Sequence, residues 1–189
     1  MPSKTPRARI LQAALEQLAA GGFATTSLRD VAAKAGCTTG SVTHHFANRE
    51  ALLVAMLREA HEAAAGRMVQ RSQRAKSPRA RLRAVLEEAL PFDEVRVREW
   101  RVWLAFWSEA VHVAALADEH QRRYAEWKVL LGALVAPLVT TDAAREHAVG
   151  ALTALVDGLG LGLVLSKPGA SQLAAARAQL DSAVRGVGR

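Results

Sequence analysis

The chain has 189 residues, half of them hydrophobic, so it can bury a substantial core and is not an intrinsically disordered protein. Aromatic residues make up only 5%, while alanine, leucine and arginine abound, a balance that favours helix over sheet. The formal net charge of +7 indicates an anionic partner, either nucleic acid or an anionic membrane. The single cysteine, Cys37, excludes an intramolecular disulfide. The basic start lacks the apolar core of a secretory signal, so we expect a cytoplasmic protein.

Capping residues and glycines mark the first predicted helices. The first helix spans residues 7–20 and ends at a pair of glycines. Ser27 is the expected N-cap of the second helix, with Asp30 in the capping-box position, and Gly36 supplies the left-handed residue that ends it. Thr38 is the expected cap of a short third helix that reaches about residue 46.

Capping residues and prolines also mark the longer predicted helices. Asn48 can cap a fourth helix that reaches about residue 74, and Ser77 followed by Pro78 begins a fifth. Pro91 separates the fifth helix from a tryptophan-rich helical region. The later helices are expected over residues 94–113, 115–138, 142–166 and 170–186. The predicted fold class is therefore all-α.

An apolar run over residues 148–165 is just long enough to be weighed as a membrane span. Asp157 lies in its middle, glycines lower its helix propensity, and no matching aromatic belts flank it. We therefore expect no membrane partner and interpret the run as a helix buried on nearly all sides.

The predicted third helix lies within GCTTGSVTHHF, residues 36–46. At 100° per residue, Val42 and Phe46 form an apolar edge, which leaves an outward face of glycine, serine, threonine and histidine. Such short polar side chains let a helix backbone enter the major groove and hydrogen-bond base edges. With the preceding helix and a tight turn at residues 35–37, the pattern predicts a helix-turn-helix. The alternative is a helical hairpin that merely packs in a core.

The segment TTSLRDVAAKAGCTTGSVTHHFANREALL, residues 25–53, resembles the DNA-binding domain of the TetR family of bacterial transcription repressors. That family's pattern runs T-x-x-x-I-A-x-x-A-G-V-S-x-G-x-x-x-x-[HY]-F-x-x-K-x-x-L. WRVWLAFWSEA and ALVDGLGLGLVL, residues 100–110 and 154–165, resemble the ligand domain of the BetI-like subgroup, choline-responsive repressors of betaine synthesis. Thr43 and Cys37 depart from the family's usual aromatic and valine, so no operator sequence is carried over.

The resemblance implies a ligand-responsive repressor. It further implies a homodimer that binds a palindromic double-stranded DNA operator and is released by a small-molecule inducer, for the BetI-like subgroup a quaternary ammonium compound such as choline. The helix-turn-helix DNA-binding domain is expected over residues 1–47, and the helical ligand-binding and dimerisation domain over residues 48–189.

Position by position, the resemblance also implies a set of DNA contacts. The residues at or near base edges are Thr39, Gly40, Ser41, Thr43 and His44. The phosphate contacts come from Ser27, Thr38, His45 and Arg49, several of them at helix N-termini, where free N–H groups favour an anion. Ser27 and Thr38 are alternatively caps alone. Lys4, Arg7 and Arg9 form either an arm in the minor groove or a solvated terminus.

A second basic cluster lies where the fourth helix meets the fifth. Its members are Arg67, Arg71, Arg74, Lys76, Arg79, Arg81 and Arg83. We interpret it mainly as a solvated face, with an extra DNA-facing patch as the alternative.

A group of aromatic residues is the candidate inducer site. Trp100, Trp103 and Trp107 share one helical face, and Phe106, Tyr124 and Trp127 can join them across a neighbouring helix. Indole faces hold quaternary ammonium groups by cation–π attraction, although large aromatics equally form ordinary core. Glu109 and Asp157 are acids that can balance a ligand cation, and Asp157 can instead bond a helix end or a dimer partner.

Small residues recur at every fourth position in the predicted eighth helix, at Gly150, Ala154, Gly158 and Gly162. This spacing lets two helices approach closely and, by the resemblance, marks the dimer interface; close packing within one protomer is the alternative.

The sequence contains no H-x-x-x-H pair, glycine-rich phosphate loop or nucleophile elbow, so we expect no catalytic residue, metal or cofactor. The rival functions are a non-specific DNA-organising protein, and an enzyme or binding protein that uses the tryptophan pocket.

Overall fold

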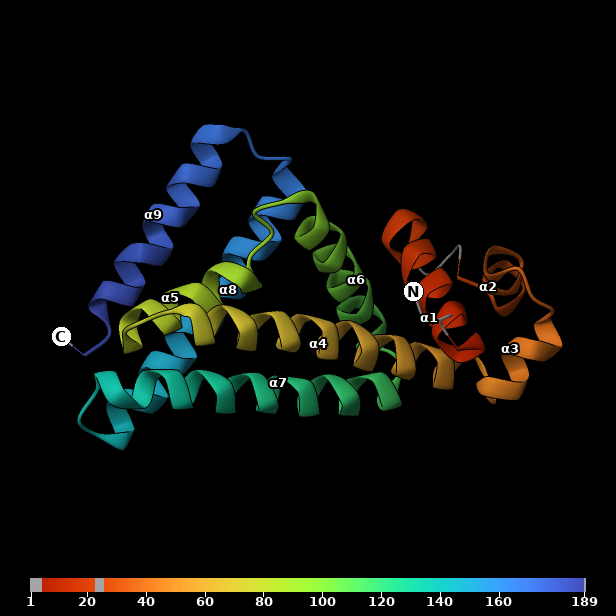
Figure 1. The fold of residues 1–189 in the computed structure, drawn as a ribbon, viewed down its shortest axis with the longest axis horizontal. Coiled ribbons are helices and arrows are strands. Elements are labelled where there is room, and N and C mark those ends of the chain that lie inside the picture. Colours follow the sequence, from red (N-terminus) through yellow and green to blue (C-terminus); the bar gives the residue numbers. More distant parts are fainter. Residues whose placement is uncertain (1–4, 23–25, 189) are drawn as a thin grey trace. The chain divides into compact units, whose positions relative to one another are not determined.

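The computed structural model describes residues 5–22 and 26–188, and its secondary structure in these ranges is helical throughout (Figure 1). The predicted all-α class is confirmed. The chain forms two compact units, which we call unit 1 and unit 2. Unit 1 comprises residues 1–62 and 101–121, and unit 2 comprises residues 63–100 and 122–189.

Unit 1 contains the three short helices α1 (Pro6–Gly21), α2 (Leu28–Ala35) and α3 (Thr39–His45). Unit 2 contains α5 (Pro78–Ala89), the 3-10 turn η2 (Ala136–Leu138), α8 (Asp142–Ser166) and α9 (Ala170–Gly186). Three helices contribute residues to both units: α4 (Arg49–Arg74), α6 (Glu94–Ala110) and α7 (Ala114–Val135). The domain boundary at residue 47 stays a prediction. Unit 1 takes in residues 1–47 together with parts of α4, α6 and α7.

The predicted capping residues occupy the expected positions. The side-chain oxygens of Ser27, Thr38, Asn48 and Ser77 each accept a hydrogen bond from the backbone N–H three residues later, at 2.8–3.2 Å. Each cap satisfies one N–H group that the helix itself leaves unpaired. Gly36 ends α2 with φ 64° and ψ 41°, the left-handed conformation that favours glycine. The predicted starts of α2 to α5 are therefore confirmed.

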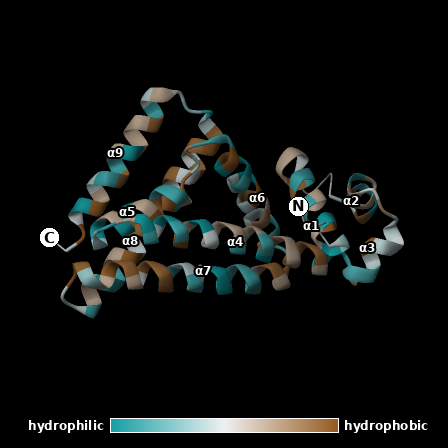
Figure 2. Ribbon diagram, viewed as in Figure 1, coloured by the Kyte–Doolittle hydropathy of each residue, from teal (hydrophilic) through white to brown (hydrophobic). Residues whose placement is uncertain are grey.

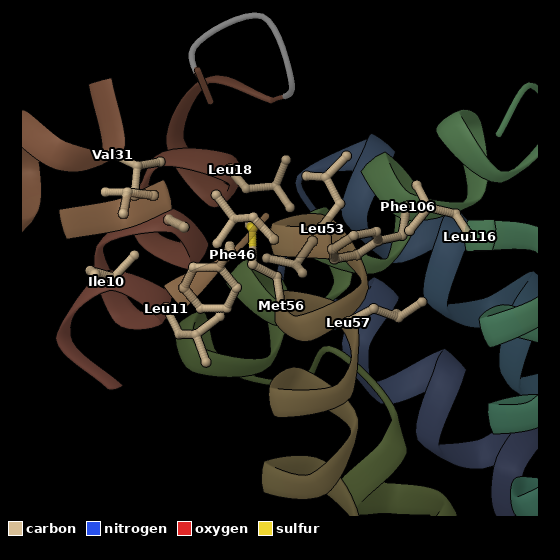
Figure 3. Packing of buried hydrophobic residues seen from close by; sticks show 14 of the residues in the cluster. Ile10, Leu11, Leu18, Val31, Phe46, Leu53, Met56, Leu57, Phe106 and Leu116 are labelled. Atoms are coloured by element: carbon tan, nitrogen blue, oxygen red, sulfur yellow. The ribbon is translucent and has the colours of Figure 1, made fainter. Parts of the chain in front are cut away.

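The core of unit 1 holds α3 in place by one edge (Figure 3). Val42 is fully buried and Phe46 is 3% exposed, which confirms the predicted apolar edge. They join side chains from α1, α2, α4, α6 and α7, among them Ile10, Leu11, Leu18, Val31, Leu53, Met56, Phe106 and Leu116. Because the buried edge anchors the short helix, its opposite face is presented to solvent in one orientation.

In unit 2, α8 is buried on one side only, so the expectation of burial on nearly all sides is wrong. Its buried residues are Leu152, Thr153, Val156, Gly160 and Leu163. The other side carries exposed apolar residues, including Leu161 and Leu165, which are 41% and 71% exposed. Within the described ranges, α8 is the one helix long and apolar enough to cross a membrane, and 33% of its apolar window is buried. The spacing of apolar residues in the sequence does not tell whether an apolar helix face is buried within its own chain or is left for another molecule to cover.

Several arginines of the second basic cluster form hydrogen bonds within the chain, so the cluster is not simply a solvated face. Arg67 and Arg71 each donate from Nε to the buried carboxylate of Glu88, at 2.9 and 3.1 Å. Arg96 on α6 donates to the same carboxylate at 2.8 Å. Three guanidinium groups thus compensate one buried charge. The sequence did not reveal this network because α5 and α6 supply the acid and the third arginine.

Other members of the cluster fasten α5 to α9. Arg79 donates to the backbone carbonyl of Val184, and to that of Val187 at 3.0 Å. Arg83 donates to Asp181 at 2.6 Å, and this hydrogen bond, opposed by burial, raises the pKa of its guanidinium. The carbonyl ends of a helix carry partial negative charge, so a cation there is favourable. Part of the cluster therefore positions the last helix.

Candidate functional site

The outward face of α3 carries the residues predicted to contact base edges. Thr39, Gly40, Thr43 and His44 are exposed, and Ser41 is half-buried. Figure 2 colours α3 mainly white and teal, the colours of weakly and strongly hydrophilic residues. All of these side chains are short or planar, so the helix can approach a groove closely, and the hydroxyls and imidazole can hydrogen-bond there.

Two side chains on this face are already oriented by local contacts. The Thr43 hydroxyl donates to the backbone carbonyl of Gly40 at 3.1 Å, so its oxygen can meet a base only as an acceptor while that bond persists. The rings of His44 and His45 contact edge to face at 5.2 Å between centroids, and His45 contacts Phe46 in the same way at 6.4 Å. His45 is consequently held against the core, while His44 is exposed.

Three of the four predicted phosphate contacts lie at helix N-termini, and His45 is the last residue of α3. Ser27 and Thr38 cap α2 and α3, and Arg49 is the first residue of α4; all three are exposed. The Ser27 hydroxyl also donates to the Asp30 carboxylate, which ties the cap to the residue at the capping-box position. Capping is therefore established for both residues and remains compatible with a phosphate contact, because other N–H groups of the first turn stay available.

The predicted minor-groove arm is shorter than the sequence indicated. Arg7 and Arg9 lie in the first turn of α1, and the Arg7 guanidinium lies over the Phe46 ring at 5.4 Å from its centroid. Lys4 lies outside the described residues. Thr5 caps α1, with Pro6 as its first residue, so the helix begins before the predicted arm ends.

The aromatic residues predicted to form one pocket fall into two groups, and each belongs to its own unit. In unit 1, Trp103 and Trp107 are half-buried. Trp103 contacts His61 edge to face at 6.4 Å between centroids, and Trp107 contacts His120 in the same way at 6.1 Å. Phe106 is part of the core, and Glu109 is half-buried. Sequence reasoning missed His61 and His120, because α4 and α7 bring them to α6 from distant positions.

Unit 1 also contains a buried carboxylate that the sequence did not single out. Glu119 on α7 is 1% exposed and accepts a hydrogen bond from Arg58 on α4 at 2.9 Å. This hydrogen bond and the attraction of the carboxylate raise the pKa of the Arg58 guanidinium. A buried charge requires such a partner, so the pair ties α7 to α4 within the unit.

The unit 2 group includes Trp100, which is held in place at two points. Its indole N–H donates to the Ala89 carbonyl at 2.8 Å, and the side chain is buried. The ring lies so close to Gly160 that a Cβ atom there would come within 1.9 Å of it. Glycine is thus required at position 160 to admit the ring. Trp127 in the same unit is half-buried.

Tyr124 and Asp157 of unit 2 are joined directly. The Tyr124 hydroxyl donates to the Asp157 carboxylate at 2.5 Å. Burial first, and then this hydrogen bond and the nearby negative charge, raise the pKa of Tyr124 well above its usual range. The phenol therefore stays protonated and holds the carboxylate in one orientation, an arrangement that suits a cation site.

Comparison with known proteins agrees with the helix-turn-helix and the larger helical part. Residues 10–56 match the family described as "Bacterial regulatory proteins, tetR family", and residues 78–189 match "BetI-type transcriptional repressor, C-terminal". The HTH-type transcriptional regulator BetI of Burkholderia mallei (strain NCTC 10229) is 35% identical over 158 residues, covering 82% of this chain and 80% of the relative.

Solved structures show the same fold. A transcriptional regulator from Rhodococcus sp. Rha1 matches with a TM-score of 0.85 and 28% identity, over 98% of this chain and 99% of that one. A transcriptional regulator from Saccharomonospora viridis, solved in complex with choline, matches with a TM-score of 0.84 and 26% identity over 95% of each chain.

Helix α3 buries one edge and exposes a polar face, and residues 10–56 match the TetR family model. Together they define a DNA-binding transcriptional regulator. The chain belongs to the TetR family and carries a BetI-type C-terminal domain, so it is a transcriptional repressor of that type. This family regulates transcription and does not catalyse reactions, so the enzyme alternative is set aside.

Proposed function

We propose that this repressor binds a palindromic operator as a homodimer in the cytoplasm and leaves it when a small quaternary ammonium compound, such as choline, binds. The observation that carries the DNA part of the proposal is α3: a buried edge at Val42 and Phe46, and an exposed polar face opposite. A helix anchored in this way can be pressed into a groove without losing its orientation.

We assign two kinds of DNA contact to different residues. Thr39, Gly40, Ser41, Thr43 and His44 meet base edges and carry sequence preference. Ser27, Thr38, His45 and Arg49 meet phosphates, which fixes the position of the helix without reading sequence.

The dimer proposal rests on the exposed face of α8. An added Cβ at Gly150, Gly158 or Gly162 would meet nothing within 4 Å, and Ala154 is also exposed. Among the described residues, no side chain therefore packs closely on these three glycines, which favours a contact with a second subunit over packing within one protomer. Small residues at this spacing admit a second helix, and burying Leu161 and Leu165 there removes apolar surface from water.

A groove and a second row of small residues lie beside the α8 row and support the same dimer surface. A groove of about 560 Å³ between α7 and α8 runs up to Gly150 and is lined by Val129, Gly132 and Ala133. On α9, which packs against α8, the exposed residues Ala174, Ala178 and Ser182 again recur every fourth position. A two-fold symmetric pair of α8 and α9 would give a four-helix interface in which the same patches serve both subunits.

The inducer proposal rests on the unit 2 residues Trp100, Tyr124 and Asp157, with Trp127 nearby in sequence on the same helix as Tyr124. An indole ring and an oriented carboxylate are the two elements that bind a cation without hydrogen-bond donors. The structural relative from Saccharomonospora viridis was solved with choline, which supports this ligand class here. Trp103, Phe106, Trp107 and Glu109 of unit 1 remain further candidates.

Release of DNA follows from a population shift. The inducer must bind more tightly to a conformation whose two recognition helices are wrongly spaced for successive major grooves, because only differential affinity moves the equilibrium.

The test uses fluorescence anisotropy with the DNA beside the protein's own coding sequence and a shuffled fragment of equal length. We expect two protomers per site, a preference of about 10³ or more for the natural fragment, and release on adding choline. Equal affinity for both fragments would instead indicate a non-specific DNA-organising protein. Tight specific binding that choline leaves unchanged would contradict the inducer class alone.

A further inference from the structure

The buried side of α8 contains a hydroxyl group without a partner. Thr153 is 6% exposed, yet its Oγ1 makes no hydrogen bond. A threonine inside a helix commonly donates to the carbonyl one turn earlier, and Thr153 does not. Leaving a buried hydroxyl unpaired costs stability, so its presence calls for an explanation.

Its position on the helix offers one. Thr153, Asp157 and Gly160 lie at spacings of four and three residues, within about 60° of one another around the axis of α8. Gly160 receives the Trp100 ring, and Asp157 receives the Tyr124 hydroxyl. Along about 10 Å of one helix, unit 2 therefore presents an aromatic ring, an oriented carboxylate and an unpaired hydroxyl.

We propose that Thr153 is a specificity-determining residue that hydrogen-bonds the hydroxyl of the inducer, so that the site selects a hydroxyalkyl quaternary ammonium over a plain alkylammonium. This inference rests on the proposed function of the same site. The Trp100 ring and Asp157 bind the cationic end, and neither distinguishes one trimethylammonium compound from another. Thr153 supplies the missing discrimination, because a hydroxyl both donates and accepts.

The neighbouring carboxylate restricts the choice further. A ligand carboxylate could also accept a hydrogen bond from Thr153, but Asp157 lies one turn away on the same face, where like charges repel. An alcohol carries no such charge. The site is therefore expected to prefer the alcohol choline to the corresponding acid, trimethylglycine.

The test is isothermal titration of the full-length protein with choline and with ethyltrimethylammonium, which keeps the cation and lacks the hydroxyl. For wild type we expect choline to bind about tenfold more tightly. Thr153→Val keeps the shape and removes the hydroxyl, so the two ligands should bind equally. Thr153→Ser keeps the hydroxyl and should keep the preference.

A second readout does not depend on any ligand. Because the hydroxyl is unpaired in the free protein, Thr153→Val should raise the melting temperature slightly, whereas a hydroxyl with a hidden partner would make the variant less stable. A destabilised Thr153→Val, or a preference for choline that persists in it, overturns the assignment.

Equal binding of the two cations by wild type overturns the role of Thr153 and leaves the proposed inducer class intact. Binding of neither cation overturns both. The two failures are thus distinguishable.

Discussion

Two helices, α3 in unit 1 and α8 in unit 2, each bury one edge and leave a row of small residues exposed. On α3 the exposed residues are polar, and on α8 they are glycine, alanine and leucine. Small side chains in both places permit a close approach by another molecule. The polarity then indicates what approaches: hydrogen-bonding groups belong against base edges, and an apolar row belongs against another apolar helix.

The comparison also separates two uses of glycine. Gly40 and Gly158 both leave room at a surface, whereas Gly160, two residues further along α8, is filled from inside by the Trp100 ring. The same residue type on one helix thus leaves open space at the surface in one place and admits a ring from inside in the other. The two glycines differ only in where a Cβ atom would point: into open space at Gly158, and into the Trp100 ring at Gly160.

The largest expected effect comes from filling the α8 row. Gly158→Leu should weaken dimerisation by two orders of magnitude or more, because the added side chain forces the helices apart and symmetry applies it twice. Light scattering across a dilution series measures this. Gly66→Leu is the matched control, since Gly66 is also an exposed helical glycine with nothing within 4 Å. A dimer that tolerates Gly158→Leu would move the interface elsewhere.

The next effect concerns the α3 face. His44→Ala should weaken binding to the natural operator by about 1–3 kcal/mol and barely alter binding to shuffled DNA. Arg49→Ala should instead weaken both, because a phosphate contact carries no sequence information. Anisotropy titrations with the two DNAs give the comparison. Equal losses on both DNAs for His44→Ala would remove it from the base-reading set.

A third prediction concerns the inward side of α8. Tyr124 is the only tyrosine, so ultraviolet absorbance of tyrosinate reports on it alone. Burial and the Asp157 hydrogen bond raise its pKa, so ionisation should begin well above the roughly 10 of free tyrosine. The pKa of Tyr124 is higher in the folded than in the unfolded chain. The protonated phenol therefore contributes fully to the free energy of unfolding below pH 10, and this contribution declines as the pH rises further.

Asp157→Asn is the control for this titration. It keeps the buried environment of Tyr124 and removes the charge, so the midpoint should fall part of the way toward that of free tyrosine. A wild-type midpoint near that of free tyrosine would mean that the Tyr124–Asp157 contact is absent in solution.

The smallest expected effect is at the attachment of α9. Arg79→Gln removes the guanidinium that donates to two terminal carbonyls of α9 and should lower the free energy of unfolding by about 1 kcal/mol. Urea titration measures it. Arg81→Gln is the control, because Arg81 donates at 3.3 Å to Ala75 just before its own helix. Equal losses from the two variants would show that the α9 contact adds nothing specific.

The sequence by itself determined the local features of this protein. The caps at Ser27, Thr38, Asn48 and Ser77, the left-handed Gly36 and the buried edge of α3 were all predicted. The physical reason is range: a cap or a helix face depends on residues within about four positions, which the sequence places directly. The small-residue row of α8 was equally visible for the same reason.

Only the tertiary structure decided which distant groups meet. It brought three arginines to Glu88, Arg79 to the end of α9, and Tyr124 to Asp157, and it exposed one side of α8. A run of basic residues looks the same in the sequence whether it faces water, an acid on another helix or another molecule. The same holds for an apolar run. That choice depends on how helices distant in sequence pack, and on the cost of leaving a buried charge or hydroxyl unpaired, which no local pattern encodes.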